Sequence, residues 1–170
     1  MVDFVVRPAV ENDVASILEI HNAAIVESLA IWSEETVDID ERLTWFAERA
    51  RGGNPILVAE SGAEVIGYAS YGPWRQKSGY RFTVENSVYV RSTHRGGGVG
   101  RALMGDLIAR ARAAGLHAMI ADIESGNEAS IRLHESFGFV REGLVREVGT
   151  KFGRWLDLAI LRLPLHERES

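Results

Sequence analysis

Cysteine is absent from the 170-residue sequence. Its absence excludes disulfides, metal sites built from thiolates and a cysteine nucleophile. It is also typical of proteins from a reducing compartment. Long uninterrupted apolar runs are absent too, and residues 1–14 carry charges at Asp3, Arg7, Glu11 and Asp13. A signal peptide and a membrane-spanning helix are therefore not expected, and we predict a cytoplasmic protein that does not bind membranes.

The sequence also lacks an excess of positive charge. The chain has 19 Lys and Arg against 24 Asp and Glu, which gives a net charge of −5. Nucleic acid is therefore not an expected partner, and Arg110 and Arg112 are interpreted as part of a solvated helix face. Metal-ligand spacing is missing among His21, His94 and the other histidines, so no metal site is predicted. An anionic ligand would have to be held by local groups.

Residues 1–170 suffice for one compact domain and are too few for two ordinary ones, so a single domain is expected. Apolar residues recur at helical spacing in some segments and at strand spacing in others. Hairpins at both ends of the chain indicate a mixed sheet rather than a fully parallel one. The helix at 40–51 is expected to carry Leu43, Phe46, Ala47 and Ala50 on one face. Helices are predicted at about 11–25, 40–51, 99–114 and 127–137, and strands at 4–7, 56–59, 65–69, 82–90, 118–123, 144–148 and 155–161.

The most informative motif is Arg95-Gly96-Gly97-Gly98-Val99-Gly100, between a predicted strand and a predicted helix. The first amides of a helix lack partners, and the helix dipole adds partial positive charge there. Glycines let a phosphate approach the backbone, and Arg95 and Arg101 add formal charge nearby. A simple turn needs one or two glycines rather than four in six positions, so the segment predicts an anion site.

Two nucleotide-binding motifs do not fit this segment. The phosphate loop of an NTPase needs Gly-Lys-Ser/Thr, but here Gly100 is followed by Arg101 and Ala102. A dinucleotide fingerprint needs a third glycine at a place where this chain has Arg101 or Leu103.

The pattern Arg-x-x-Gly-x-Gly after a strand and at a helix start resembles the pyrophosphate loop of the GNAT acetyltransferases. Arg7-Pro8-Ala9 with Asp13, and the segment 127–139, extend the resemblance over nearly the whole chain. It implies an α+β, three-layer fold with a mixed, mostly antiparallel twisted sheet of about seven strands and about four flanking helices. It also implies acetyl-CoA as co-substrate, bound by strand backbone, loop amides and later polar side chains: Val88, Tyr89, Val90, Arg95, Gly96, Gly97, Gly98, Val99, Gly100, Arg101, Asn127 and Ser130.

Further segments resemble one subgroup of that family, the phosphinothricin and methionine sulfoximine N-acetyltransferases. This subgroup acetylates the α-amino group of small amino-acid analogues whose other end is tetrahedral and charged or strongly polar. The resemblance therefore implies a substrate such as phosphinothricin, methionine sulfoximine or methionine sulfone, and it implies a homodimer. The segments lie at 30–32, 71–75, 83–90, 132–135 and 149–157.

Acetylation requires a base, because an α-amine arrives largely as ammonium. Glu85 is the candidate, on the strand expected beside the pantetheine, where burial would raise the pKa of its carboxyl. The alternative is a structural ion pair between Glu85 and Arg81. A backbone N–H near Val88 is expected to stabilise the oxyanion of the thioester. His134 stands where most of the family has the tyrosine that protonates the leaving thiolate, so it is either a proton donor or a structural histidine.

Substrate contacts are expected from the cations and aromatic rings of segment 74–81, because arginine binds carboxylates and phosphinates through paired hydrogen bonds. For Lys77 the role of an ordinary surface charge is an equal alternative. Lys151 and Arg154 are expected to close the site from the last hairpin, and Trp32 and Trp155 to belong to the core. The predicted substrate-binding residues are Trp74, Arg75, Gln76, Lys77, Arg81, Glu85, Asn86 and Ser87.

Two other functions stay open from the sequence. A CoA-binding module without chemistry would bind acetyl-CoA and transfer nothing, and the presence of Glu85 argues against it. The second alternative is an acetyltransferase for a protein N-terminus, a polyamine or an aminoglycoside. Polyamines and aminoglycosides are cationic and favour an acidic pocket, whereas segment 75–81 is basic.

Overall fold

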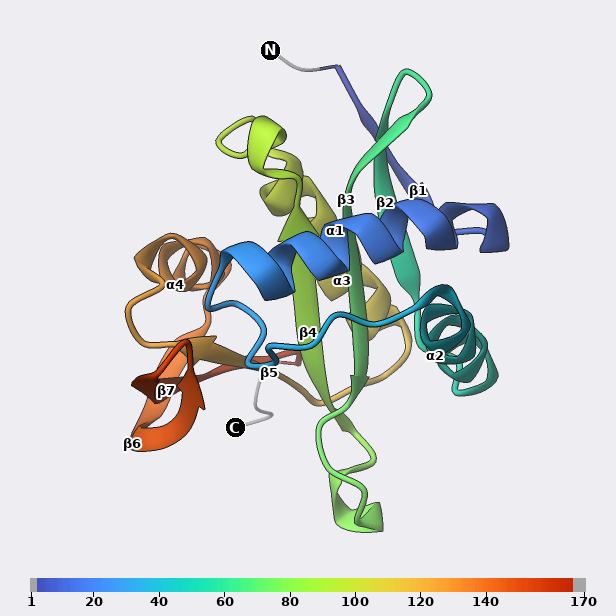
Figure 1. Ribbon diagram of the computed structural model, residues 1–170. Helices are drawn as coiled ribbons and strands as arrows, with labels where there is room; N and C mark the ends of the chain where they lie inside the picture. The colour runs from blue at the N-terminus through green and yellow to red at the C-terminus, as the bar shows by residue number, and fades with distance from the viewer. Residues whose placement is uncertain (1–2, 167–170) are drawn as a thin grey trace.

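The computed structural model describes residues 3–166 and contains one seven-stranded sheet in the order β1-β2-β3-β4-β5-β7-β6 (Figure 1). Every neighbouring pair of strands is antiparallel except β4 and β5, which are parallel. The predicted mixed, mostly antiparallel sheet is therefore confirmed. The strands are β1 (Val5–Pro8), β2 (Ile56–Ser61), β3 (Glu64–Pro73), β4 (Thr83–Val90), β5 (Ala118–Glu124), β6 (Val140–Lys151) and β7 (Arg154–Pro164).

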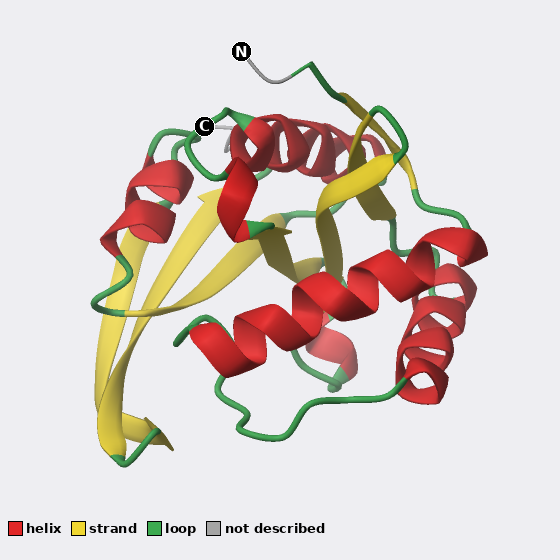
Figure 2. Cartoon of the chain, turned by 45° about the horizontal axis from the view of Figure 1, so that its top comes forward, coloured by secondary structure: helices red, strands yellow, loops and turns green. Residues whose placement is uncertain are grey.

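Helices cover both faces of the sheet, which gives the three layers that the sequence predicts (Figures 1 and 2). On one face α1 (Val14–Glu27) and α2 (Ile39–Arg51) pack over β2, β3 and β4. On the other face α3 (Val99–Ala113) and α4 (Glu128–Glu135) enclose the larger hydrophobic core. Short 3-10 turns complete the set: η1 (Glu11–Asp13), η2 (Ser78–Tyr80) and η3 (Ser92–His94).

β4 supplies side chains to both layers, because successive residues of a strand point to opposite faces. Val84 and Val88 pack into the core beneath α3, whereas Tyr89 packs with the cluster beneath α1 and α2. Glu85 therefore projects on the α1 and α2 side of the sheet, and Asn86 on the α3 and α4 side.

The parallel seam between β4 and β5 is short. Only three residue pairs join the two strands, from Thr83 opposite Ala118 to Glu85 opposite Ile120. Beyond Glu85 the strands diverge, although β4 continues to Val90 and β5 to Glu124. The second half of β4 therefore has an unpaired backbone edge inside the sheet.

The inward stripe of α2 differs from the prediction. Leu43 and Phe46 are partly buried, and Phe46 packs on the core as predicted, but Ala47 and Ala50 are exposed. Arg42 is buried instead, and Trp45 and Arg49 are partly buried. These three residues follow one another at helical spacing and face Tyr68 or β3. The spacing of apolar residues does not reveal this stripe, because two of its three members are arginines.

The last hairpin is longer than predicted, since β6 and β7 together run from Val140 to Pro164. β6 is exposed along nearly its whole length, so it lacks the burial alternation that marks a strand in sequence. A bulge between Val145 and Gly149 opposes β7, and Glu147 in it has a φ of 47°.

Two predictions about this hairpin are wrong. Trp155 is not a core residue, because it is 68% exposed. Lys151 does not close a substrate site, because it is only 1% exposed and its Nζ donates to three carbonyl oxygens. These carbonyls belong to Ile25, Ser28 and Ile31, at distances of 2.5, 2.7 and 2.6 Å, and they lie where α1 ends. Lys151 thus ties the hairpin to the end of α1.

Candidate active site

A groove of about 1110 Å³ opens where β4 and β5 diverge. Its floor is the unpaired edge of β4, one wall is the second half of α1, and the other wall is α4. Eleven of the twelve residues predicted to bind the cofactor line this groove, and Gly97 is the exception. They are Val88, Tyr89, Val90, Arg95, Gly96, Gly98, Val99, Gly100, Arg101, Asn127 and Ser130.

The glycine segment forms the end of this groove at the start of α3. Gly98 is the N-cap residue of α3, with a φ of 83°, and no side chain caps the first amides of the helix. A residue with a Cβ is strained at that φ, so glycine is required by the backbone rather than by lack of space. The free amides and the helix dipole fit a pyrophosphate there.

Asn127 and Ser130 stand together on the α4 wall. The Oδ1 of Asn127 accepts a hydrogen bond from the backbone N–H of Ser130 at 3.2 Å and so caps α4. Both Asn127 and Ser130 line the groove. On the opposite wall Ala23 and Ala24 of α1 line the groove, a contribution that the sequence reading did not identify.

His134 is buried at the inner side of the same groove. Its Nδ1 donates to the carbonyl oxygen of Ser130 at 2.7 Å, and its Nε2 lies 3.0 Å from Oδ1 of Asn86. The Nδ2 of Asn86 in turn donates to the carbonyl oxygen of Ile120 at 3.1 Å. Burial lowers the pKa of His134 and so favours the neutral ring, although the hydrogen bond to the carbonyl of Ser130 opposes this shift.

Asn86 is therefore engaged on the α3 and α4 side of the sheet. Both ends of its amide have protein partners, so the structure holds it beside His134 and not beside Glu85. Ser87 follows on the same side as Glu85 and lines the groove.

Glu85 lies at the last paired position of the β4–β5 seam, and the next two residues, Asn86 and Ser87, line the groove. Burial and, to a smaller extent, the nearby negative charge of Asp122 raise the pKa of its carboxyl to about 7, while the charge of Arg49 opposes the rise. Asp122 itself has a raised pKa because of burial, which Trp74 and Arg75 partly offset. A carboxyl group whose pKa lies near neutral pH is suited to act as a general base.

The alternative of a Glu85–Arg81 ion pair is not what the structure contains. Arg81 donates to the carbonyl oxygen of Ser78 at 3.1 Å, and its guanidinium lies 4.6 Å from the ring centre of Phe82. The charged groups around Glu85 are Asp122 and Arg49, neither of which the sequence reading singled out.

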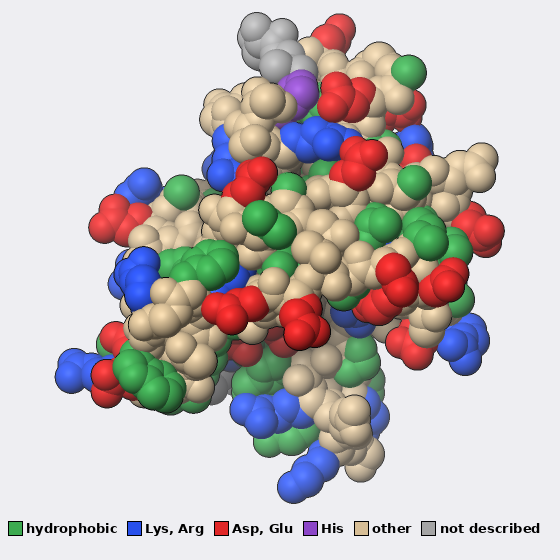
Figure 3. Space-filling model, in the orientation of Figure 1, with side chains coloured by type: hydrophobic (Ala, Val, Ile, Leu, Met, Phe, Trp, Pro, Cys, Tyr) green, Lys and Arg blue, Asp and Glu red, His purple; other side chains and the backbone are tan. Residues whose placement is uncertain are grey.

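The predicted substrate loop divides into two parts. Trp74 and Arg75 stack on each other, with the guanidinium carbon 4.4 Å from the ring centre, and both act on the pKa of Asp122. Gln76, Lys77 and Arg81 are exposed on the loop around η2. Figure 3 shows Lys and Arg side chains gathered on this projecting loop, at the bottom of the view. Of these residues only Trp74 and Arg75 lie near a carboxyl group, that of Asp122, and Arg75 is itself exposed.

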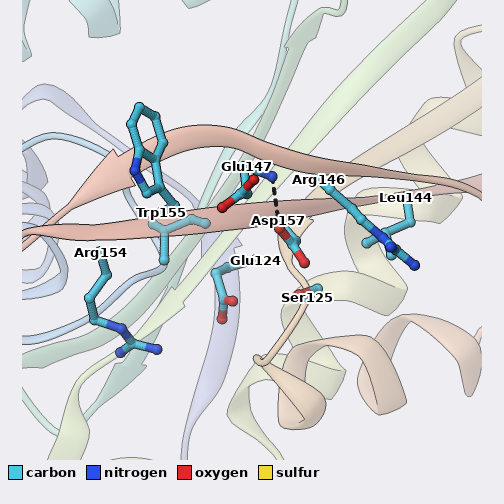
Figure 4. A pocket seen from close by; sticks show the side chains of 9 residues that line it. Glu124, Ser125, Leu144, Arg146, Glu147, Arg154, Trp155 and Asp157 are labelled. Carbon is cyan, nitrogen blue, oxygen red and sulfur yellow. Dashed lines mark hydrogen bonds between the residues drawn. The ribbon is translucent and has the colours of Figure 1, made fainter.

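Arg154 lines a second hollow of about 570 Å³, between β6–β7 and the end of β5 (Figure 4). The bulge of β6 forms its rim, where the backbone N–H of Glu147 donates to Oδ1 of Asp157 at 2.8 Å. Arg154 and Trp155 come from the same strand end. Glu124 borders both this hollow and the large groove.

The sequence pattern did not identify Arg49 and Asp122, because both lie far in sequence from Glu85, the residue that they influence. The signal for Arg49 was present, since Arg42, Trp45 and Arg49 fall on one helical stripe. Asp122 interrupts the apolar run of a strand that is otherwise buried. A charged residue at such a position is unusual and indicates a functional or structural role. In residues 3–166 no group of three or more His, Asp or Glu side chains is arranged to hold a metal ion.

The chain matches the Acetyltransferase (GNAT) family over residues 17–139. L-methionine sulfoximine/L-methionine sulfone acetyltransferase from Pseudomonas aeruginosa is 54% identical, covering 97% of this chain and 96% of the relative. Phosphinothricin N-acetyltransferase from Alcaligenes faecalis is 38% identical, covering 97% and 84%. A Salmonella typhimurium protein solved with its cofactor acetyl-CoA has a TM-score of 0.95 and 49% identity, covering 98% of this chain and 96% of that chain.

The glycine turn at the start of α3, the groove between the diverging strands β4 and β5, and these matches agree with one another. The chain belongs to the GNAT family and is an acetyl-CoA-dependent N-acetyltransferase.

Proposed function

We propose that this protein acetylates the α-amino group of a small amino-acid analogue with a tetrahedral polar end, such as methionine sulfoximine or methionine sulfone. The observation that carries the proposal is Glu85, a carboxyl whose pKa is raised to about 7, directly before the groove-lining residues Asn86 and Ser87. The name of the Pseudomonas relative supports the substrate class. Phosphinothricin, named for the less similar Alcaligenes relative, is the related substrate expected to be used less efficiently.

In this reaction Glu85 accepts the proton that the ammonium must lose, directly or through one water. The free amine then attacks the thioester carbonyl, and a C–N bond forms in a tetrahedral intermediate. The C–S bond of this intermediate breaks to release CoA as thiolate, and the nitrogen loses its second proton, which the thiolate or solvent takes up. Backbone N–H groups at the unpaired edge of β4, near Val88, stabilise the carbonyl oxygen as it gains charge. The eleven groove residues and Gly97 hold acetyl-CoA, the glycine turn binding its pyrophosphate.

We propose that His134 donates the proton to the leaving thiolate, because it lines the groove. Burial lowers its pKa, which opposes the protonated ring and favours a structural role. The alternative is that His134 only ties α4 to β4 through Asn86. A thiolate can leave unaided, since thiol pKa values are about 8.5.

Trp74 and Arg75 are proposed to receive the polar end of the substrate, beside Asp122. Gln76, Lys77 and Arg81 are proposed to attract it electrostatically from the projecting loop, and Ser87 to border the reacting group. This basic surround disfavours polyamines and aminoglycosides, which are cationic.

The test is steady-state thiol release with methionine sulfoximine, methionine sulfone, phosphinothricin, a polyamine and a peptide. We expect the highest kcat/KM for the two methionine derivatives, a lower value for phosphinothricin and little turnover of the others. Efficient acetylation of the peptide or polyamine alone would contradict the substrate class. Tight acetyl-CoA binding with no turnover of any amine would contradict catalysis and favour a binding module.

Three further properties belong to the same proposal: a single acetyltransferase domain over residues 1–170, a cytoplasmic location and a homodimer. No helix in residues 3–166 is long and apolar enough to cross a membrane. Support for a dimer comes from exposed apolar side chains on β6, on β7 and in the turn between them, namely Val140, Leu144, Val145, Val148, Phe152 and Trp155. Acetylation of a toxic amino-acid analogue blocks its amine, so the activity would confer resistance to such compounds.

A further inference from the structure

Arg49 occupies an unusual place against the sheet. It lies in the last turn of α2, and its guanidinium covers the backbone of Gly72 in β3. A Cβ built on Gly72 would overlap Nη1 and Cζ of Arg49, so the guanidinium fills the space of the missing side chain. Gly72 is the residue directly opposite Glu85 in the β3–β4 ladder. Cross-strand partners project on the same face, which places the guanidinium beside the carboxyl of Glu85.

The guanidinium of Arg49 is incompletely satisfied. Its Nε is buried and has no hydrogen-bond partner among residues 3–166. Burial and the neighbouring cation of Arg42 lower the pKa of Arg49, and only the longer-range charges of Glu85 and Glu48 oppose them. A partly buried cation without bonded partners is costly, and an anion that arrives with a ligand would remove this cost.

Arg42 differs from Arg49 in this respect, although both belong to the inward stripe of α2. Arg42 donates from Nε and Nη2 to the carboxylate of Glu41, at 2.5 and 2.6 Å. The ring of Trp45 lies between the two arginines, 4.6 Å from Cζ of Arg42 and 5.9 Å from Cζ of Arg49. One cation of the stripe is thus used within the protein, and the other faces the candidate base.

We propose that Arg49 binds the α-carboxylate of the substrate and thereby selects α-amino acids over other amines, an inference that rests on the proposed function. In an α-amino acid the amine and the carboxylate share one carbon, so a carboxylate at Arg49 places the amine next to Glu85. Guanidinium matches a carboxylate with two parallel hydrogen bonds. An amine without that carboxylate would leave Arg49 buried and unpaired, which is a strong basis for rejection.

The test compares methionine sulfone with 3-(methylsulfonyl)propylamine, the same molecule without its carboxylate, in the wild type and in Arg49→Gln. At pH 9, where Glu85 is ionised in both proteins, we expect Arg49→Gln to lower kcat/KM for methionine sulfone at least about 100-fold, mainly through KM, and to leave the weak turnover of the amine within about threefold. Arg49→Lys should retain part of the preference. Arg51→Gln, an exposed arginine of the same helix, is the matched control and should change neither substrate.

Gly72→Ala provides a second variant that keeps the arginine. Its Cβ would displace the guanidinium, so the preference for methionine sulfone should fall as in Arg49→Gln, while acetyl-CoA affinity stays unchanged in both variants. If Arg49 acted only by lowering the pKa of Glu85, Arg49→Gln would shift the acidic limb of the pH–rate profile to higher pH. The kcat/KM of both substrates would then return to the wild-type value at pH 9.

Equal losses for the two substrates, or recovery at pH 9, would overturn the assignment of Arg49 and leave the proposed function intact. Failure of the wild type to acetylate methionine sulfone or any other α-amino acid analogue would overturn the proposed function and this assignment together.

Discussion

The carboxyl of Glu85 is surrounded by groups that favour its neutral form. Burial and Asp122 both raise its pKa, to about 7, against the opposing charge of Arg49. The catalytic form is the carboxylate, so activity must fall as pH drops below that value. Glu85→Gln is expected to lower kcat roughly 100- to 10,000-fold and to abolish the acidic limb of the pH profile.

Asp122→Asn provides the matching comparison in the same pH–rate measurement. It removes a negative charge that raises the pKa of Glu85, so the acidic limb should move to lower pH with activity retained. An acidic limb that survives in Glu85→Gln would show that another group accepts the proton.

Glu85 is also expected to reduce stability above neutral pH. Its pKa is higher in the folded protein than the ordinary value of 4.5, so the folded state binds the proton more tightly. That contribution is present below pH 4.5 and is lost as pH rises through about 7. Glu85→Gln should therefore raise the melting temperature at pH 8, and the gain should shrink toward pH 5. Glu35→Gln on the exposed link is the control, and a gain that did not depend on pH would contradict this reasoning.

Some residues of the candidate site could be predicted from the sequence, and others could not. The groove residues from Val88 to Arg101 were predictable because one local segment holds them, and the glycines of a helix start have a recognisable pattern. Glu85 followed from its strand position. Arg49 and Asp122 depend on α2 and β5 meeting at Glu85, which no local pattern contains.

Among the elements, the β6–β7 hairpin is fixed to α1 by one buried ammonium. The three carbonyl oxygens that Lys151 binds would all be left without partners in Lys151→Met. We expect a loss of about 3–5 kcal/mol in the free energy of unfolding, or roughly 10 °C in melting temperature. Lys77→Met on the exposed loop should change stability by no more than about 0.5 kcal/mol.

The KM for methionine sulfone distinguishes the structural role of Lys151 from the role that the sequence predicted, which was to close the substrate site. A lysine that closes the substrate site would raise KM when replaced, without loss of stability. Stability lost with an unchanged KM in the surviving folded enzyme supports the structural tie.

Elements with a regular period were predicted well, and the exposed hairpin was not. α3 and β4 each have one buried face, so their periods of 3.6 and 2 stand out in the sequence. β6 has almost no buried residue, and its bulge shifts the register, so only its middle was recognised. The buried stripe of α2 was misassigned because arginine stems and guanidinium groups replaced apolar side chains there.

At the scale of the whole molecule, the exposed apolar hairpin is the surface where a partner copy is expected. Trp155 is 68% exposed and Phe152 51%, which is unusual for large apolar side chains on one element. Trp155→Glu should convert the proposed dimer to a monomer in light scattering at micromolar concentration. Val26→Glu, at an exposed valine of α1, is the control and should leave the mass unchanged. A dimer that persists in Trp155→Glu would place the interface elsewhere.

The three-pair seam between β4 and β5 has a consequence for the life of the protein in a cell. If acetyl-CoA binds along the edge that the seam leaves open, as proposed, it completes the sheet there and adds to the stability of the fold. A ligand at 100 times its dissociation constant adds about 2.7 kcal/mol to stability. When carbon supply falls and acetyl-CoA is scarce, more of the enzyme unfolds and is open to proteolysis. Its abundance would then follow the nutritional state of the cell with no regulator other than its own co-substrate.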